Sequence, residues 1–145
     1  MKNVNKNDVI ITNTSENVED VCKAVAWLGD DEIVTGGHAT IIKHNENAKF
    51  LVYYSQTSMF FQQKRKFAVG TKVIDVSTTN LAKIKIPVPP IYEQERIVSI
   101  LDRFDTLVND ITQGLPSEIE AREKRYEYYR HKLLTFKEFK ALNGL

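Results

Sequence analysis

The sequence predicts a small mixed α+β domain over residues 1–90, followed by a long helical arm over residues 91–145. Short β-rich segments separated by turn residues occupy the first part, and two long amphipathic segments occupy the second. Between them stand Pro87, Pro89 and Pro90, which favour an extended chain because proline is excluded from helix interiors. The chain is therefore expected to hold one modest domain and one elongated helical element.

The expected domain begins with a strand at residues 8–12, DVIIT, which is rich in β-branched residues and bounded by polar ones. Residues 21–27 and 32–34 are expected to pair as a hairpin across the turn at residues 29–31. Another strand is expected at residues 39–44. These segments are too short to stand alone and need a common core.

The rest of the domain is expected to begin with one helix over residues 47–67, which ends at cations that suit a helix C-terminus. A loop with a short strand over residues 70–76 and a turn over residues 77–82 are expected next. A last strand, over residues 83–86, alternates apolar and polar side chains.

The arm is predicted to contain two helices, over residues 93–113 and 117–138. Gly114 and Pro116 interrupt it, since glycine suits a helix end and proline a first turn. The first helix carries one apolar stripe, with residues three and four positions apart: Ile97, Leu101, Phe104, Val108 and Ile111. The stripe of the second helix is weaker and consists of Ile119, Tyr126, Tyr129 and Leu133.

The helical pattern alone leaves several arrangements of the arm open. Both helices can pack onto their own domain as core, or form a coiled-coil arm that faces another helix. A third arrangement folds the arm back at residues 114–116 as a helical hairpin that buries its own stripes within a monomer.

Residues 86–136, beginning IPVPPIYEQERIVSILDRFD and continuing to YEYYRHKLLTF, resemble the conserved region of type I restriction–modification specificity subunits. The segments NDVIITNTSENVEDV and GTKVIDVSTTNLAKIKIPVPP resemble the C-terminal part of a target recognition domain of that family. Such domains are usually longer at their N-terminus, so the resemblance implies a partial domain. The implied arm is a coiled-coil spacer that pairs with a second copy and docks methyltransferase subunits.

The resemblance implies a non-catalytic subunit that reads part of a split DNA target. Its expected partners are DNA, a methyltransferase (modification) subunit, a restriction subunit and a second copy of the chain, in a homodimer through the helical arm. S-adenosylmethionine and ATP would belong to partner subunits, so no cofactor is expected here. The alternative is an interaction protein that no longer reads DNA, but dimerises and titrates specificity or modification subunits.

The candidate DNA contacts are polar loop residues and local cations, although ordinary turn chemistry and helix-end charge also explain them. Glycines allow close approach of backbone to DNA, and lysine or arginine contacts phosphate. The candidates are Thr12, Asn13, Thr14, Ser15, Asn17, Thr35, Gly36, Gly37, His38, Lys64, Arg65, Lys66 and Lys72.

Composition argues against several other classes of protein. The net charge of +1 gives no global basic field, and the single Cys22 rules out a disulfide within one chain. No phosphate-binding loop, nucleophile motif or metal-ligand spacing is found, so neither an enzyme nor a metal site is expected. The N-terminal residues lack a secretory signal and no apolar run is long enough to span a membrane, which predicts a cytoplasmic protein.

Overall fold

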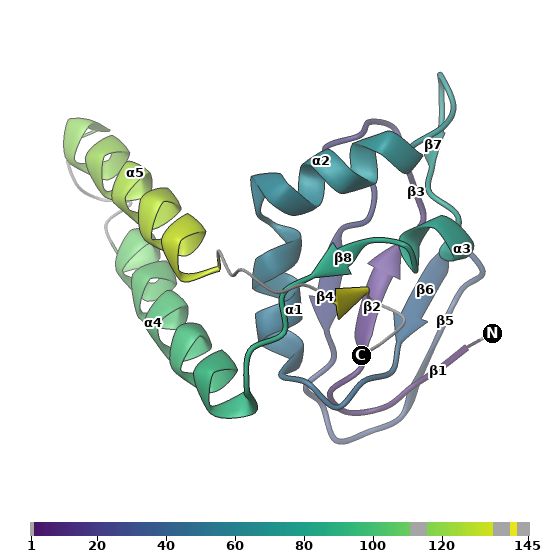
Figure 1. Ribbon diagram of the computed structural model, residues 1–145, viewed down its shortest axis with the longest axis horizontal. Helices are drawn as coiled ribbons and strands as arrows, with labels where there is room; N and C mark the ends of the chain where they lie inside the picture. Colours follow the sequence, from purple (N-terminus) through teal and green to yellow (C-terminus); the bar gives the residue numbers. More distant parts are fainter. Residues whose placement is uncertain (1, 111–115, 135–139, 142–145) are drawn as a thin grey trace.

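The computed structural model describes residues 2–110, 116–134 and 140–141, and it shows a mixed α+β fold (Figure 1). Its largest sheet is antiparallel, in the order β4–β2–β6. The strands are β1 (Lys2–Val4), β2 (Val9–Thr12), β3 (Thr14–Ser15), β4 (Ala24–Ala26), β5 (Ile33–Thr35), β6 (Ala39–Ile42), β7 (Ile74–Asp75), β8 (Lys85–Ile86) and β9 (Lys140–Ala141). Outside the largest sheet, β1 pairs with β5, β3 with β7, and β8 with β9.

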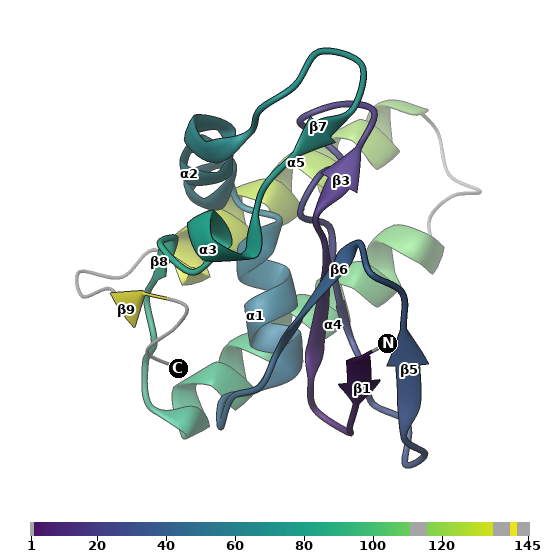
Figure 2. The same ribbon diagram turned by 90° about the vertical axis from the view of Figure 1, so that its right-hand side faces the viewer.

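The helices build two layers beside the largest sheet. They are α1 (Ala48–Ser55), α2 (Ser58–Phe67), α3 (Thr78–Leu81), α4 (Ile91–Asp110) and α5 (Pro116–Leu133). Helix α1 lies between the sheet and α4, and contacts β2 and β4 on one side and α4 on the other (Figures 1 and 2). Helix α5 lies beside α4 on the far side of the molecule from the sheet.

The core lies where the sheet, α1 and the first half of α4 meet. Along β2, the alternation of side chains buries Val9 and Ile11 on the face toward α1. Helix α1 buries Phe50 and Tyr54, and α4 adds Leu101 to the same cluster. The first half of α4 is therefore part of the domain core.

Several predicted elements are confirmed. The strands expected at residues 8–12, 39–44 and 83–86 correspond to β2, β6 and β8. Helices α4 and α5 match the expected arm helices, except that each starts earlier than predicted. Residues 111–113 of the first predicted helix and 135–138 of the second lie outside the described residues.

The predicted hairpin across residues 29–31 is wrong, because β4 pairs with β2 whereas β5 pairs with β1. The chain wraps around the indole of Trp27, whose Nε1–H donates to Asp31 O at 2.9 Å. A Cβ at Gly29 would lie 2.6 Å from that ring, so the backbone passes directly over it. The indole makes this connection a wide loop.

The single helix expected over residues 47–67 is two helices, α1 and α2, with the break at Gln56 and Thr57. The Thr57 hydroxyl donates to Tyr54 O at 2.7 Å and accepts from Phe60 N at 3.3 Å. It thus ends one helix and caps the next, a competition with helix hydrogen bonding that threonine makes readily. In the same way, Ser77 caps the short helix α3, where only a turn was expected.

The expected long coiled-coil arm is not confirmed, because both of its helices pack within the chain. Helix α4 is packed on the domain through its first half and beside α5 through its second half. The Phe104 ring stacks on Tyr129 with centroids 5.3 Å apart and meets the edge of Tyr126 at 6.3 Å. The helical hairpin is therefore the arrangement within one chain. Strand β9 was not expected from the sequence.

Candidate nucleic-acid interface and partner surface

The polar loops singled out from the sequence meet at one end of the largest sheet. Thr12 is the last residue of β2 and lies opposite Ala39, the first residue of β6. One residue further on, the Asn13 N–H donates to His38 O at 2.9 Å. The turn at residues 35–38 therefore lies directly beside residues 12–15, and Figure 2 shows β3 continuing beyond β2 at this end.

Asn13 holds this end together and is buried. Its side-chain amide donates to Val76 O at 2.8 Å, and its oxygen accepts from the Thr40 hydroxyl at 2.9 Å. The Thr40 hydroxyl also lies 2.8 Å from that of Thr78, in α3. Asn13 thus positions three segments that are far apart in the sequence, and its side chain is not presented to DNA.

The cations singled out from the sequence divide into one that is buried and three that are exposed. Lys64 is 5% exposed, and its ammonium donates to Glu19 O at 2.9 Å and Val21 O at 2.7 Å. Burial lowers the pKa of Lys64. Arg65, Lys66 and Lys72 are exposed. Lys64 therefore supports the loop at residues 19–21, and its ammonium is not presented to DNA.

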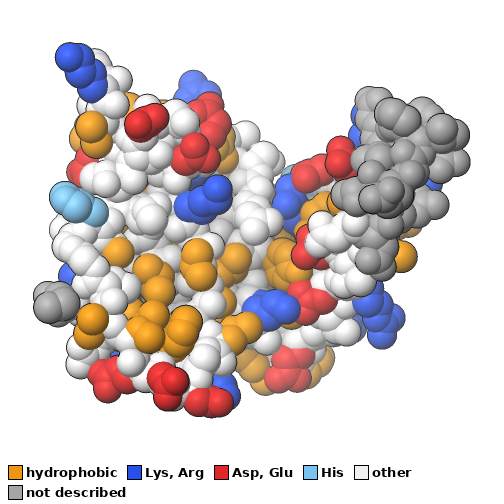
Figure 3. All heavy atoms as spheres, turned by 180° about the vertical axis from the view of Figure 1, so that it is seen from behind, with side chains coloured by type: hydrophobic (Ala, Val, Ile, Leu, Met, Phe, Trp, Pro, Cys, Tyr) orange, Lys and Arg blue, Asp and Glu red, His pale blue; other side chains and the backbone are white. Residues whose placement is uncertain are grey.

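The charge at this end of the molecule is mixed. Glu16, Glu19 and Asp20 are exposed in the loop between β3 and β4, close to the exposed cations of α2. In Figure 3, acidic and basic side chains lie next to one another at the upper end of the domain. A mixed field attracts phosphate more weakly than a uniformly basic face does.

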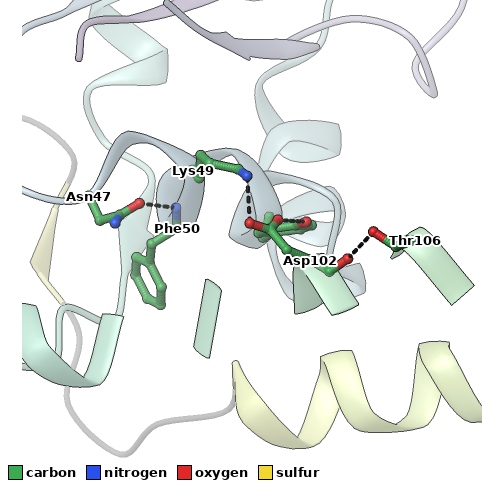
Figure 4. A network of polar contacts seen from close by, with 6 residues as sticks. Asn47, Lys49, Phe50, Asp102 and Thr106 are labelled. Carbon is green, nitrogen blue, oxygen red and sulfur yellow. Dashed lines mark hydrogen bonds and ion pairs between the residues drawn. The ribbon is translucent and has the colours of Figure 1, made fainter. Parts of the chain in front are cut away.

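A polar network joins the domain to α4 (Figure 4). The Asp102 carboxylate accepts from the Lys49 ammonium at 2.6 Å and from the Tyr53 hydroxyl. Burial and, next, the hydrogen bond to Asp102 raise the pKa of Tyr53 far above its usual range. Near the start of α4, the fully buried Gln94 accepts from Asn47 N at 2.9 Å. Helix α4 is therefore fixed to α1 and its N-cap at two places, near the start of α4 and at its middle.

The residues expected to form a partner surface lie in different environments. Ile97 and Leu101 are buried in the chain's own core, and Leu133 packs against that core. Phe104, Tyr126 and Tyr129 contact one another between α4 and α5. Val108 is half-buried beside them. Ile111 and the side chain of Ile119 lie outside the described residues.

The exposed apolar residues of the helical hairpin include two that sequence reasoning missed. Leu107 and Tyr128 are exposed, and Leu107 lines a hollow of 210 Å³ together with Phe104, Val108 and Arg125. The helical period could not select Leu107 over Val108, because neighbouring positions are only about 100° apart on a helix. Tyr128 had a signal, since it stands in a tyrosine-rich segment.

Two kinds of functional feature are absent from the described residues. Among the described residues, no group of three or more His, Cys, Asp or Glu side chains is placed to hold a metal ion. Within the same part of the chain, no helix is both long and apolar enough to cross a membrane.

Comparison with known proteins identifies the family. The family model described as the type I restriction modification DNA specificity domain matches residues 1–121. A Haemophilus influenzae protein named as a type I restriction enzyme specificity subunit is 41% identical over 112 residues, which are 77% of this chain and 25% of that protein. An Escherichia coli type I restriction enzyme specificity subunit is 58% identical over 67 residues, which are 46% of this chain and 17% of that protein.

A third relative, from Mycoplasma pneumoniae, is named as the C-terminus of a type I specificity subunit. It is 28% identical over 94 residues, which are 65% of this chain and 61% of that protein. The chain thus spans about a quarter or less of the first two relatives and more of the third. Because the family model covers most of the sequence, the chain belongs to the family of type I restriction–modification DNA specificity domains.

Proposed function

We propose that the chain is a non-catalytic DNA specificity subunit, in truncated or half form, of a type I restriction–modification system. It reads one part of a split DNA target with the end of the β4–β2–β6 sheet and binds methyltransferase subunits through its helical hairpin. The observation that carries the proposal is the match of residues 1–121 to the specificity-domain family. S-adenosylmethionine and ATP belong to the partner subunits, and the assembled complex acts on DNA in the cytoplasm.

The proposed DNA surface is the set of exposed or half-exposed candidates at the end of the sheet. It comprises Thr12, Thr14, Ser15, Asn17, Gly36, Gly37, His38, Arg65, Lys66 and Lys72, and it leaves out Thr35, whose hydroxyl oxygen is buried. Hydroxyl and amide side chains bond to phosphates or base edges, and the cations bond to phosphates. The contact between Asn13 N–H and His38 O supports this assignment, because it brings two separate polar loops onto one surface.

The proposed partner surface is the outer side of the α4–α5 pair. Phe104, Leu107 and Val108 line its hollow, and Tyr128 and Tyr129 are exposed nearby on α5. Tyrosine and arginine are the residues that most often carry binding energy at protein interfaces. This surface takes a methyltransferase subunit, and in the isolated chain it takes the same surface of a second copy, giving a dimer.

The second candidate function is an interaction protein that binds specificity or modification subunits without reading DNA. The mixed charge at the end of the sheet favours it. In that case the helical hairpin alone carries the function.

Co-expression with a type I methyltransferase subunit tests both candidates. The proposal expects the two proteins to co-purify, and expects the complex to methylate DNA only when this chain is present. The variant Leu107→Asp is expected to abolish co-purification, whereas Leu28→Asp, at an equally exposed leucine of the domain, keeps it. Co-purification without DNA binding favours the interaction protein, and no association with any subunit excludes both.

A further inference from the structure

The segment between α2 and β7 is a narrow loop that one β-bridge, between Val69 and Asp75, closes into a hairpin. Val69 N–H donates to Asp75 O at 3.0 Å, and Asp75 N–H donates back to Val69 O at 2.8 Å. On its other edge, β7 pairs with β3, with Ser15 opposite Ile74. Figure 1 shows this hairpin projecting beyond the body of the domain at upper right. It is therefore joined at its base to one of the polar loops of the proposed DNA surface.

The tip of the hairpin has a fixed shape. Gly70 has a φ of 117°, a backbone conformation that residues with a side chain rarely adopt. A Cβ added there would lie 2.0 Å from Val73 O. Only glycine lets the two sides approach this closely. Below the tip, Ile74 and Val76 are buried in the core and anchor the second side. The hairpin is therefore constrained at its tip by the turn at Gly70 and anchored at its base by Ile74 and Val76.

The side chains at the tip are unusual for a solvated turn. Val69 and Val73 are 62% and 60% exposed, and Thr71 and Lys72 between them are exposed as well. Two valines left in water contribute little to folding, because most of their apolar surface stays wet. The tip therefore presents methyl groups, one hydroxyl and one ammonium on a narrow projection.

We propose that the hairpin of residues 69–75 enters the major groove of DNA and reads base edges there. The major groove is about 12 Å wide and admits a two-stranded β-ribbon. Valine methyl groups match the C5-methyl of thymine, the Thr71 hydroxyl serves as donor or acceptor, and Lys72 reaches phosphate or guanine. This inference rests on the proposed function, since it assigns the groove-reading part of the same surface.

A label at the tip tests the placement in the full-length chain, alone and with a methyltransferase subunit. Thr71→Cys carries an environment-sensitive fluorophore. Glu32→Cys carries the control label, because residue 32 comes just before β5, at the end of that strand away from the turn at residues 36–38. The native Cys22 is buried and stays unlabelled. The probe is a pool of random duplexes of about 40 base pairs at about 50 mM salt, with total binding measured independently by anisotropy. The label at position 71 is expected to respond to DNA, and that at position 32 is not.

Paired substitutions test the reading role. The double variant Val69→Ser/Val73→Ser is expected to lose thymine preference in sequences selected from the pool, with about 10-fold weaker binding to the wild-type selection. Val25→Ser, at a valine 57% exposed on the sheet, leaves the preference unchanged. Lys72→Ala is expected to weaken binding about 5-fold and to lower the salt slope by about one, which Lys85→Ala does not.

Each outcome separates the inference from the function on which it rests. Binding with an unresponsive label at position 71 and unchanged preference in the double variant overturns the groove-reading hairpin and keeps the DNA-reading subunit. Loss of methyltransferase binding in the double variant, with DNA binding intact, makes the hairpin a protein contact and also overturns the inference. If the wild-type chain binds no DNA with or without the methyltransferase subunit, the proposed function fails, and the inference fails with it.

Discussion

The Tyr53 hydroxyl donates a hydrogen bond to the Asp102 carboxylate, and this contact ties the last turn of α1 to the middle of α4. Lys49 donates to the other carboxylate oxygen at 2.6 Å, so one side chain of the arm holds two of the domain. The direction in which the helical hairpin leaves the domain depends on this junction.

Removing the charge of Asp102 is expected to weaken the junction modestly. Because Lys49 and Asp102 are each about 40% exposed, water screens their ion pair, and Asp102→Asn should cost about 1 kcal/mol of unfolding free energy. Asp105→Asn is the control, because the side chain of Asp105 makes no hydrogen bond or ion pair with the described part of the chain. Urea unfolding measures both, and equal losses would show that the junction contributes nothing specific.

Lys64 is expected to matter for stability and not for DNA. Lys64→Met removes the donor to two carbonyls, Glu19 O and Val21 O, and should lower the unfolding free energy by about 2 kcal/mol. Lys66→Ala, at an exposed cation of the same helix, should change it by less than about 0.5 kcal/mol. Thermal and urea unfolding distinguish the two. A stable Lys64→Met variant with weakened DNA binding would return Lys64 to the DNA surface.

Cys22 is expected to make the protein less stable in alkali. Burial raises the pKa of its thiol from 9.0 to about 11, so the folded state keeps a proton that the unfolded state releases. This contribution is complete below pH 9 and is lost as the pH rises through about 11. Unfolding free energy measured across that range should fall more steeply for the wild type than for Cys22→Ala. Parallel slopes for the two proteins would contradict the assignment.

Asn13→Ala is expected to loosen the end of the sheet. The change leaves the buried Val76 O and the Thr40 hydroxyl with one partner fewer, a cost of about 1–3 kcal/mol. Hydrogen exchange should quicken at residues 36–38 and in α3, whereas Asn3→Ala, at an exposed position of β1, should leave both unchanged. If exchange quickens only at residue 13 itself, Asn13 does not connect these segments.

The isolated chain is expected to form a dimer through its helical hairpin at tens of micromolar. Leu107 is 52% exposed on the partner surface and Leu28 is 51% exposed on the domain, so Leu107→Asp and Leu28→Asp form a matched pair. Light scattering on a size-exclusion column should show a monomer only for the first. Leu101→Asp is not a suitable probe, because Leu101 is fully buried in the domain core. A monomeric wild type would refute the dimer.

Periodicity in the sequence identified the helices α4 and α5 but not what each face of them contacts. Ile97, Leu101, Phe104 and Val108 fall on one stripe, and the sequence treats them alike. In the fold, the first two meet α1 and the others lie toward α5, since α4 passes from the domain to the hairpin along its length. An apolar stripe shows that a helix has an apolar face. Which segments that face contacts depends on residues far away in the sequence.

Similar reasoning explains where the candidate DNA residues lie in the fold. The polar segments at residues 12–15 and 35–38 lie side by side because Thr12 and Ala39 are paired in the sheet, and the sequence does not show this pairing. Lys64 was indistinguishable from Lys66 in the sequence. Its partners, Glu19 O and Val21 O, are 45 and 43 residues away, and no local pattern reports such a contact.

The burial of Ile97 and Leu101 bears on how such proteins can be recombined. A chimera that joins a new recognition domain at Pro90 would replace the cluster that contains Phe50 and Tyr54, but keep the half of α4 that fills it. The mismatch would leave cavities or clashes at the centre of the domain. A junction after Leu101 keeps this cluster together with the residues of α4 that fill it, and leaves Leu133 and Leu134 as the core contacts to be matched. The segment to exchange therefore ends inside the helix and not at the prolines before it.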